Sequence, residues 1–254
     1  MGSLSIHDLT KNFGGVKAVD TFNCDIQEGR TQAIIGPNGA GKTTIFNLIT
    51  GIYKPSAGEI VFDGETITGH APHQIARRGI ARTFQNIRLF PDFSVLENIQ
   101  TADHVRSSYS LFHGFLPTPL RRRQEQASRD HALELLHLVG LEGRFGERAR
   151  NLPYGHQRRL EIARALALDP KILLLDEPAA GMNPEETQSL MALIQRIKEQ
   201  FRLTILLIEH HMELVMGLCN FITVIDFGKE IAEGTPEQIQ ANPQVIQAYL
   251  GVEA

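Results

Sequence analysis

The stretch "GPNGAGKTT" (residues 36–44) has the residue types and the spacing of a loop that binds phosphate groups. Its glycines allow the backbone to curl so that successive N–H groups point at phosphate oxygens. Lys42 brings a positive charge to the β- and γ-phosphates, and the Thr43 hydroxyl is a suitable ligand for Mg²⁺. The stretch therefore predicts a nucleotide site with Mg²⁺. The residues predicted to bind the nucleotide here are Gly36, Pro37, Asn38, Gly39, Ala40, Gly41, Lys42, Thr43 and Thr44.

A pair of carboxylates follows an apolar run in "ILLLDEP" (residues 172–178). Such a run is typical of a strand covered on both faces, and ligands of open α/β sheets bind at the carboxyl ends of the strands. Asp176 is predicted to hold the Mg²⁺ shell, and Glu177 to orient or deprotonate an attacking water. A solvated acidic pair after a core strand would explain these residues taken alone, but the phosphate loop favours the catalytic interpretation.

The stretch "NLPYGHQRRLEIARAL" (residues 151–166) predicts a loop that leads into a helix. The free N–H groups at the start of a helix attract anions. The residues do not show which anion is bound there. They also do not show whether this chain or a second copy binds the rest of the ligand that carries the anion.

Length and composition indicate a soluble globular protein with one large or two modest domains. The chain has 254 residues, of which 42% are apolar and 21% charged. Its net charge of -4 argues against a nucleic-acid-binding surface, which is usually basic. Cys24 and Cys219 are far apart in sequence, which favours free thiols in a reducing cytosol. The sequence predicts neither a membrane-spanning segment nor a signal peptide.

The elements that position these motifs are predicted from apolar patterning and turn residues. Partly alternating strands at 3–13 and 19–29 predict an antiparallel sheet. A further strand is predicted at 57–67, with a tight turn at Asp63 and Gly64. A buried strand at 31–36 leads through the phosphate loop into a helix at 42–51. Strands at 171–177 and 203–209 flank a helix at 184–200, which predicts a βαβ crossover and a parallel sheet. A hairpin at 221–234 and a short helix at 242–251 close the chain.

The middle of the chain is predicted to be helical and to contain an insertion. Ser94 caps one helix, and another ends at Gly140. Between them, the stretch "LFHGFLPTPLRRR" (residues 111–123) is predicted to be an insertion. We expect a single α/β domain over residues 1–254, with a nucleotide-binding core at 1–92 and 165–254 and a helical subdomain at 93–164.

Five motifs occur in one order along the chain and carry a family resemblance. They are "GPNGAGKTT", "ARTFQN", "LPYGHQRRLEIARAL", "ILLLDEP" and "LLIEHH". In this the chain resembles the nucleotide-binding subunit of an ABC transporter, over essentially its whole length. The resemblance implies a P-loop NTPase fold of the ABC ATPase type, with a mixed core sheet, an N-terminal antiparallel β subdomain and an inserted α-helical subdomain. It also implies ATP and Mg²⁺ as ligands and Mg²⁺-dependent ATP hydrolysis.

The resemblance further implies a head-to-tail dimer with a second ATPase subunit, either identical or different. In this family the signature helix covers the γ-phosphate of the ATP that the partner subunit holds, so that two ATP molecules are sandwiched. By that likeness, Tyr154, Gly155 and His156 contact phosphate across the dimer. The anion at the helix start is thus expected to be the triphosphate of the second copy's nucleotide.

Three further residues match family positions. Phe13 resembles the aromatic residue that stacks on adenine, Gln85 the residue that senses Mg²⁺ and water, and His210 the histidine that contacts the γ-phosphate. The resemblance therefore implies Glu177, His210 and Gln85 as catalytic residues. The metal site would comprise Thr43, Gln85 and Asp176. The alternatives are an ordinary strand-end core residue for Phe13 and a hydrogen-bonded core histidine for His210.

The chain departs from the family pattern at three positions. The family signature usually has a serine where this chain has Pro153, so one hydrogen bond to the γ-phosphate is expected to be lost, at a cost of roughly 1.5–3 kcal/mol. Asn183 occupies the position of an aspartate and is explained by helix capping. His211 stands where this subfamily commonly has aspartate.

Features along the whole chain resemble the branched-chain (hydrophobic) amino-acid importers of the LivG type. They are "DEPAAGMNPEET", "ILLIEHHMELVMGLC", the predicted insertion and the tail "GTPEQIQANPQVIQAYLG". The resemblance implies two membrane permease subunits, a solute-binding protein reached through them, and a peripheral position on the cytoplasmic face of the inner membrane. The basic triplet Arg121 to Arg123 is expected to be a solvated face, with contact to anionic lipid or a membrane subunit as the alternative.

Other functions stay open from the sequence. An ATPase for a urea or amide importer, or for lipopolysaccharide export, would share most of these motifs. A weakly hydrolytic ATP-binding partner subunit would be explained by Pro153. An ABC protein that acts on ribosomes or DNA is disfavoured by the single set of motifs and the negative charge.

Overall fold

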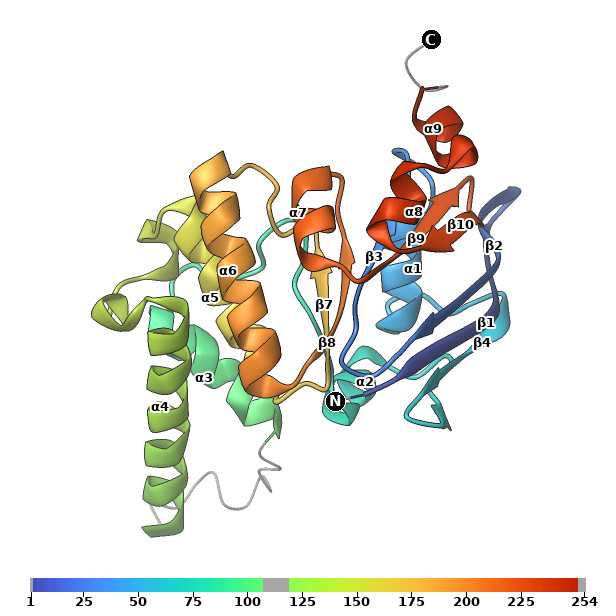
Figure 1. The fold of residues 1–254 in the computed structure, drawn as a ribbon. Helices are drawn as coiled ribbons and strands as arrows, with labels where there is room; N and C mark the ends of the chain where they lie inside the picture. Colours follow the sequence, from blue (N-terminus) through green and yellow to red (C-terminus); the bar gives the residue numbers. More distant parts are fainter. Residues whose placement is uncertain (1, 107–118, 251–254) are drawn as a thin grey trace. The chain divides into compact units, whose positions relative to one another are not determined.

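The computed structural model describes residues 2–106 and 119–250, without the side chains at 104–106, 119–121 and 250 (Figure 1). The chain divides into two compact units, Met1–Gln85 with Lys171–Ala254 and Asn86–Pro170. The predicted insertion at 111–123 lies largely outside the described residues. No helix in the described part is both long and apolar enough to cross a bilayer.

An antiparallel sheet forms one layer of the first unit. Its order is β2–β1–β4–β5. The strands are β1 Leu4–Phe13, β2 Val16–Ile26, β4 Ala57–Phe62 and β5 Glu65–Thr66. Asp63 and Gly64 both have positive φ, at 50° and 80°, and form the tight turn between β4 and β5. The predicted antiparallel sheet and its turn are confirmed.

A six-stranded sheet carries the predicted site motifs, in the order β10–β9–β3–β8–β7–β6. The strands are β3 Thr31–Ile35, β6 Ile80–Arg82, β7 Ile172–Asp176, β8 Thr204–Ile208, β9 Phe221–Asp226 and β10 Lys229–Gly234. All neighbours pair in parallel except β9 and β10, which form the predicted closing hairpin. The prediction of a mixed core sheet is therefore confirmed, and β3 and β7 end at the same edge.

The helices of the first unit are α1 Lys42–Ile49, α2 Pro72–Arg78, α6 Pro184–Phe201, α7 Met212–Leu218, α8 Pro236–Gln240 and α9 Pro243–Leu250. Helix α6 joins β7 to β8 in the predicted βαβ crossover. The Asn183 side chain accepts a hydrogen bond from the Glu186 N–H, and the Glu186 carboxylate accepts one from the Asn183 N–H. This reciprocal capping is a structural role for Asn183 at the start of α6.

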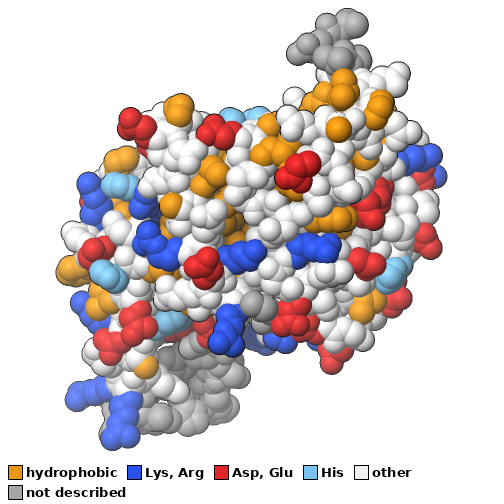
Figure 2. Space-filling view, in the orientation of Figure 1, with side chains coloured by type: hydrophobic (Ala, Val, Ile, Leu, Met, Phe, Trp, Pro, Cys, Tyr) orange, Lys and Arg blue, Asp and Glu red, His pale blue; other side chains and the backbone are white. Residues whose placement is uncertain are grey.

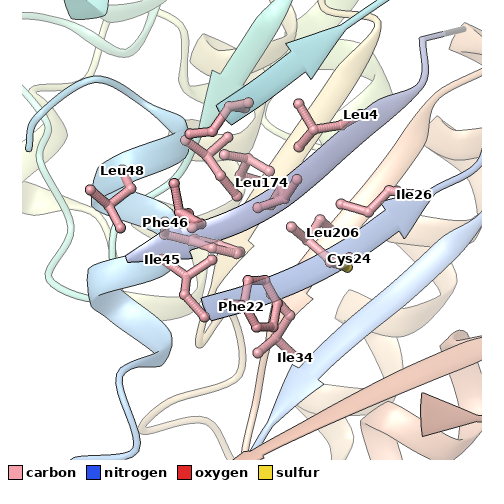
Figure 3. Packing of buried hydrophobic residues seen from close by; sticks show 14 of the residues in the cluster. Leu4, Phe22, Cys24, Ile26, Ile34, Ile45, Phe46, Leu48, Leu174 and Leu206 are labelled. Atoms are coloured by element: carbon pink, nitrogen blue, oxygen red, sulfur yellow. The ribbon is translucent and has the colours of Figure 1, made fainter. Parts of the chain in front are cut away.

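The core of the first unit lies around α1, between the two sheets (Figure 3). Ile45 and Phe46 of α1 are fully buried, together with Phe22 of β2 and Leu206 of β8. Burying large apolar side chains contributes about 1.5–3 kcal/mol each. Because α1 is anchored on both sides, its first turn and the loop before it have a fixed position.

The second unit is helical, as predicted. It contains α3 Val95–Arg106, α4 Pro119–Val139 and α5 Tyr154–Leu166, with short 3₁₀ turns at Glu142–Arg144 and Ala149–Asn151. Ser94 and Glu97 form a capping box at the start of α3, and Gly140, at φ 72°, follows the end of α4. Figure 2 shows basic and acidic side chains interspersed on the face of the molecule in that view.

The boundaries of the second unit differ from the expected 93–164. Residues 86–92 belong to it because their backbone bonds to its helices. The Phe90 N–H donates to Asn98 Oδ1 over 2.9 Å, and the Arg88 N–H donates to Glu161 Oε1 over 3.3 Å. Both contacts are hydrogen bonds from the backbone to polar side chains, so apolar patterning did not reveal them.

Candidate functional site

The phosphate loop joins β3 to α1, and its glycines are required by the backbone. Gly36, Gly39 and Gly41 have φ values of 154°, 83° and 102°. A Cβ on Gly36 would lie 2.0 Å from the Ile225 carbonyl oxygen, and one on Gly41 would lie 2.4 Å from that of Ala18. Two of the three glycines are therefore fixed by close contact with neighbouring strands as well as by left-handed backbone geometry.

The turn of the β9–β10 hairpin braces the loop. The Gly228 N–H donates to the Ala40 carbonyl over 2.9 Å, and the Asp20 N–H donates to the Gly228 carbonyl over 2.8 Å. The loop is thus linked through this turn to the antiparallel sheet. This preserves the curled shape in which its N–H groups can face an anion.

Lys42 is largely buried at the start of α1, with 8% of its surface exposed. Its Nζ donates to the carbonyl oxygens of Gly36 and Pro37 over 2.7 and 2.9 Å. Burial lowers the pKa of the Lys42 ammonium, and the Glu177 and Asp176 carboxylates oppose that shift. A hollow of about 220 Å³ lies over the loop and is lined by Ala18, residues 38–44 and Glu177. The ammonium is therefore held beside the loop and close to the two acidic residues.

Asp176 is buried at the end of β7, with 2% of its surface exposed. Its Oδ2 pairs with Arg82 Nη2 over 2.7 Å, while its Oδ1 is buried without a hydrogen-bond partner among the described residues. A buried carboxylate oxygen with no donor is a costly arrangement that a cation relieves. The oxygens of the Asp176 carboxylate and the Thr43 hydroxyl are of the kind that Mg²⁺ prefers as ligands.

Arg82 is a residue of this site that the sequence analysis missed. It lies in β6 and also donates to Asn47 Oδ1 of α1 over 2.8 Å and to Oγ1 of Thr50, the C-cap residue of α1, over 3.2 Å. Its guanidinium lies 5.4 and 4.8 Å from the ring centroids of Phe46 and Phe84. It therefore connects the end of β7 to α1. The available signal was a charged residue inside a short strand, three positions before Gln85.

Glu177, Gln85 and His210 lie together. Glu177 has a positive φ of 45°, and its N–H donates to the Ile208 carbonyl over 2.9 Å. Gln85 Nε2 donates to Glu177 Oε2 over 2.8 Å, and His210 Nδ1 lies 3.7 Å from the same oxygen. The three side chains predicted to be catalytic thus converge on one carboxylate, from the ends of β6, β7 and β8.

Glu209 is a second residue that the sequence analysis did not single out. It is fully buried at the end of β8. Its Oε1 accepts the Ala179 N–H over 3.0 Å, and its Oε2 accepts the His210 and His211 N–H groups over 2.9 and 3.1 Å. Its carboxylate therefore ties the loop after β7 to the loop after β8, and so fixes the positions of Glu177 and His210.

Phe13 ends β1 and is 42% exposed, so the alternative of an ordinary core residue does not fit. Its ring meets that of Tyr53 edge to face at 5.2 Å, and Lys11 Nζ lies 5.0 Å from its centroid. An exposed aromatic ring held in this way has a free surface for stacking.

The signature segment starts α5 in the second unit. Pro153 is the N-cap residue and provides no side-chain cap, and the Gln157 N–H donates to its carbonyl over 3.0 Å. The backbone N–H groups of Tyr154, Gly155 and His156 precede that first helical bond. The N-terminal end of a helix carries partial positive charge and is suited to bind an anion.

Two family models match the chain. One, described as ABC transporter, matches residues 19–180, and one, described as branched-chain amino acid ATP-binding cassette transporter, matches residues 229–254. The high-affinity branched-chain amino acid transport ATP-binding protein LivG of Escherichia coli (strain K12) is 48% identical over 98% of this chain and 97% of its own length.

Two solved structures share the fold. The ADP conformation of MJ1267, an ATP-binding cassette of an ABC transporter, has a TM-score of 0.85 and 30% identity, and covers 99% of each chain. The dimeric post-hydrolysis state of the ATP-binding cassette MJ0796, bound to ADP and Pi, has a TM-score of 0.77 and 26% identity, over 92% of this chain and 98% of that one.

Proposed function

Since this chain belongs to the ABC transporter family as an ATP-binding subunit, we propose that it hydrolyses ATP to power the uptake of branched-chain or other hydrophobic amino acids. The observation that carries the proposal is the convergence of Gln85 and His210 on the Glu177 carboxylate beside the phosphate loop. The choice of solute is supported by the 48% identity to LivG and by the match of the C-terminal residues 229–254.

In this proposal the phosphate loop binds the triphosphate through its backbone N–H groups. Lys42 moves its ammonium from the Gly36 and Pro37 carbonyls to the β- and γ-phosphates, a short shift since it already lies across the loop. The exposed Phe13 ring stacks on the adenine. Each contact uses a group that the fold holds in place before the nucleotide arrives, which lowers the cost of binding.

Thr43, Asp176 and Gln85 would hold Mg²⁺, which when bound neutralises the phosphate charge and orients the γ-phosphate for attack. The partnerless Oδ1 of Asp176 supports this assignment. Arg82 holds the other oxygen of the same carboxylate, so that Oδ1 keeps its direction.

Glu177 is proposed as the base of the hydrolysis. It accepts a proton from a water molecule whose oxygen attacks the γ-phosphorus, and the bond from that phosphorus to the β-phosphate oxygen breaks. The products are ADP and phosphate. Gln85 and His210 orient the carboxylate, and His210, which is 54% exposed, is free to contact the γ-phosphate.

We propose that two ATPase subunits, identical or different, sandwich two nucleotides. The N–H groups of Tyr154, Gly155 and His156 then cover the γ-phosphate held by the second subunit. The dimeric cassette bound to ADP and Pi supports this assembly. Two permease subunits and a solute-binding protein complete the proposed importer, with the ATPases on the cytoplasmic face of the inner membrane.

The experiment is Glu177→Gln in the purified chain. Steady-state phosphate release is expected to fall at least a hundredfold, since glutamine cannot accept the proton, while ATP binding persists and traps the dimer. Light scattering with and without ATP checks the dimer. Unchanged turnover would remove Glu177 from the role of base. If the Glu177→Gln variant stays monomeric in the presence of ATP, the proposed dimer that sandwiches the nucleotides is contradicted.

A further inference from the structure

Three potential metal ligands follow strand β8 directly, namely Glu209, His210 and His211. One donor atom from each lies within 4.8 Å of the other two. The Glu209 side chain is fully buried, whereas those of His210 and His211 are 54% and 43% exposed. The cluster therefore has a buried carboxylate at its base and two imidazoles that an ion can reach from solvent.

The distances between donors are close to those in a tetrahedral site. Glu209 Oε2 lies 3.2 Å from His211 Nδ1 and 3.9 Å from His210 Nδ1. On the other side, Glu177 Oε2 lies 3.7 Å from His210 Nδ1. Donors that are each about 2.0–2.2 Å from a tetrahedral Zn²⁺ lie about 3.3–3.6 Å from one another. The three donor atoms, which lie within 4.8 Å of one another, would have to move closer to that spacing when an ion binds.

The Glu209 carboxylate is held ready for this role. The N–H groups of Ala179, His210 and His211 all donate to it, so its orientation is set before any ion binds. Hydrogen-bonded carboxylates are typical of well-ordered metal ligands. The His211 backbone is fixed as well, because its carbonyl accepts the N–H groups of Leu214 and Val215 in α7.

Two imidazoles with carboxylates favour a first-row transition metal over Mg²⁺ or Ca²⁺, which prefer all-oxygen ligands. We propose that Glu209, His210 and His211 form an inhibitory site for Zn²⁺ or a similar divalent transition metal. The inhibition rests on the proposed function. An ion that holds His210 removes the γ-phosphate contact and takes away the imidazole that lies beside the Glu177 base.

Binding is tested without nucleotide, by titrating the full chain with Co²⁺ and following its visible absorption, and then displacing it with Zn²⁺. The test variant is His211→Asn, whose amide can still donate to Glu209 but is a poor ligand for these ions. His73→Asn, at an exposed histidine in α2, is the matched control. We expect one tetrahedral Co²⁺ per wild-type and His73→Asn chain, and binding more than about tenfold weaker in His211→Asn.

Equal affinity in the wild type and His211→Asn would overturn the site, as would an octahedral Co²⁺ spectrum in the wild type. If His211→Asn does not fold, His211→Gln is tested in its place, and the same loss of Co²⁺ affinity is expected. Because this measurement contains no ATP, its outcome does not depend on the proposed function.

Inhibition is tested by the ATPase rate at fixed MgATP and buffered free Zn²⁺, with each variant compared with its own rate without Zn²⁺. Zn²⁺ is expected to inhibit the wild type and His73→Asn at concentrations more than about tenfold below those that inhibit His211→Asn. Equal inhibition of all three chains would show that Zn²⁺ acts elsewhere and would overturn the inhibitory role. A chain with no ATPase activity that still binds Co²⁺ at this site would contradict the proposed function and leave the metal site standing.

Discussion

At the scale of single residues, the site depends on buried charges whose partners come from other strands. The side chains of Asp176 and Arg82 are 3% and 5% exposed, and they form an ion pair of 2.7 Å. A buried pair of this kind contributes little net stability, but the loss of one partner leaves an uncompensated charge in the interior. The site is therefore sensitive to the loss of either Asp176 or Arg82.

Arg82→Met should therefore lower the free energy of unfolding by about 3–5 kcal/mol. Urea denaturation without nucleotide measures it. The matched control is Arg78→Met, which removes an exposed ion pair with Glu65 and should cost about 0–1 kcal/mol. Equal losses in the two variants would contradict the importance of burial at Arg82.

The buried thiols of Cys24 and Cys219 should make the free energy of unfolding depend on pH. Burial raises the pKa of Cys24 and of Cys219 from 9.0 to about 12. Between those values the unfolded thiols release protons while the folded ones keep theirs, so the free energy of unfolding falls as pH rises. The expected loss approaches about 1.4 kcal/mol per pH unit for each thiol.

Urea denaturation at several pH values above 9.0 checks this expectation, with the double variant Cys24→Ala/Cys219→Ala as the comparison. The other titrating groups are common to both proteins, so the difference between their slopes isolates the thiols. Parallel slopes would mean that the folded thiols ionise as readily as the unfolded ones.

At the scale of elements, the phosphate loop owes its shape to the strands beside it. Gly36 lies against β9, Gly41 against β2, and the hairpin turn at Gly228 bonds to both the loop and β2. The loop therefore packs against these strands. Its glycines differ in how closely each one contacts a neighbouring strand.

Gly36→Ala should disturb the loop far more than Gly39→Ala. At Gly36 the added Cβ would lie 2.0 Å from the Ile225 carbonyl oxygen, so backbone must move, whereas at Gly39 no atom lies within 4 Å. Gly39→Ala should cost only the left-handed backbone strain, about 1–2 kcal/mol. Thermal denaturation without nucleotide compares them, and a smaller loss in Gly36→Ala would refute the close contact.

At the scale of the whole molecule, the nucleotide is proposed to bind to two copies of the fold. The phosphate loop belongs to one compact unit and the signature helix to the other. Pro153 is the N-cap residue of helix α5 and provides no side-chain cap. The strength of the proposed contact across the dimer therefore rests on the backbone N–H groups that follow.

Pro153→Ser should strengthen this contact. A hydroxyl that reaches the γ-phosphate adds a hydrogen bond to a charged group, worth roughly 1.5–3 kcal/mol, or about a tenfold or greater gain in affinity. The measurement is ATP-driven dimerisation in the Glu177→Gln background, by light scattering. Pro153→Ala is the control, because it removes the ring without adding a hydroxyl. If both variants dimerise alike, the hydroxyl adds nothing.

The sequence by itself determined the local features of this protein. The glycine loop between β3 and α1, the capping boxes of α3 and α6, and the acidic residues after β7 all follow from residues that are close in sequence. Turns, caps and strand ends depend on such neighbours, and the patterns therefore predicted many of the elements, including the βαβ crossover and the closing hairpin. The mixed sheet was implied by the family resemblance. The family resemblance added roles for Phe13, Gln85 and His210, which stay predictions.

Only the tertiary structure decided which side chains meet. Arg82 and Asp176 are 94 residues apart, Gln85 and Glu177 are 92 apart, and Ala179 and Glu209 are 30 apart. Each pair forms because parallel strands end at a common edge, and no local pattern encodes which ends are neighbours. The ion pair of Arg82 and the bond between Glu209 and Ala179 are visible for that reason only in the folded chain.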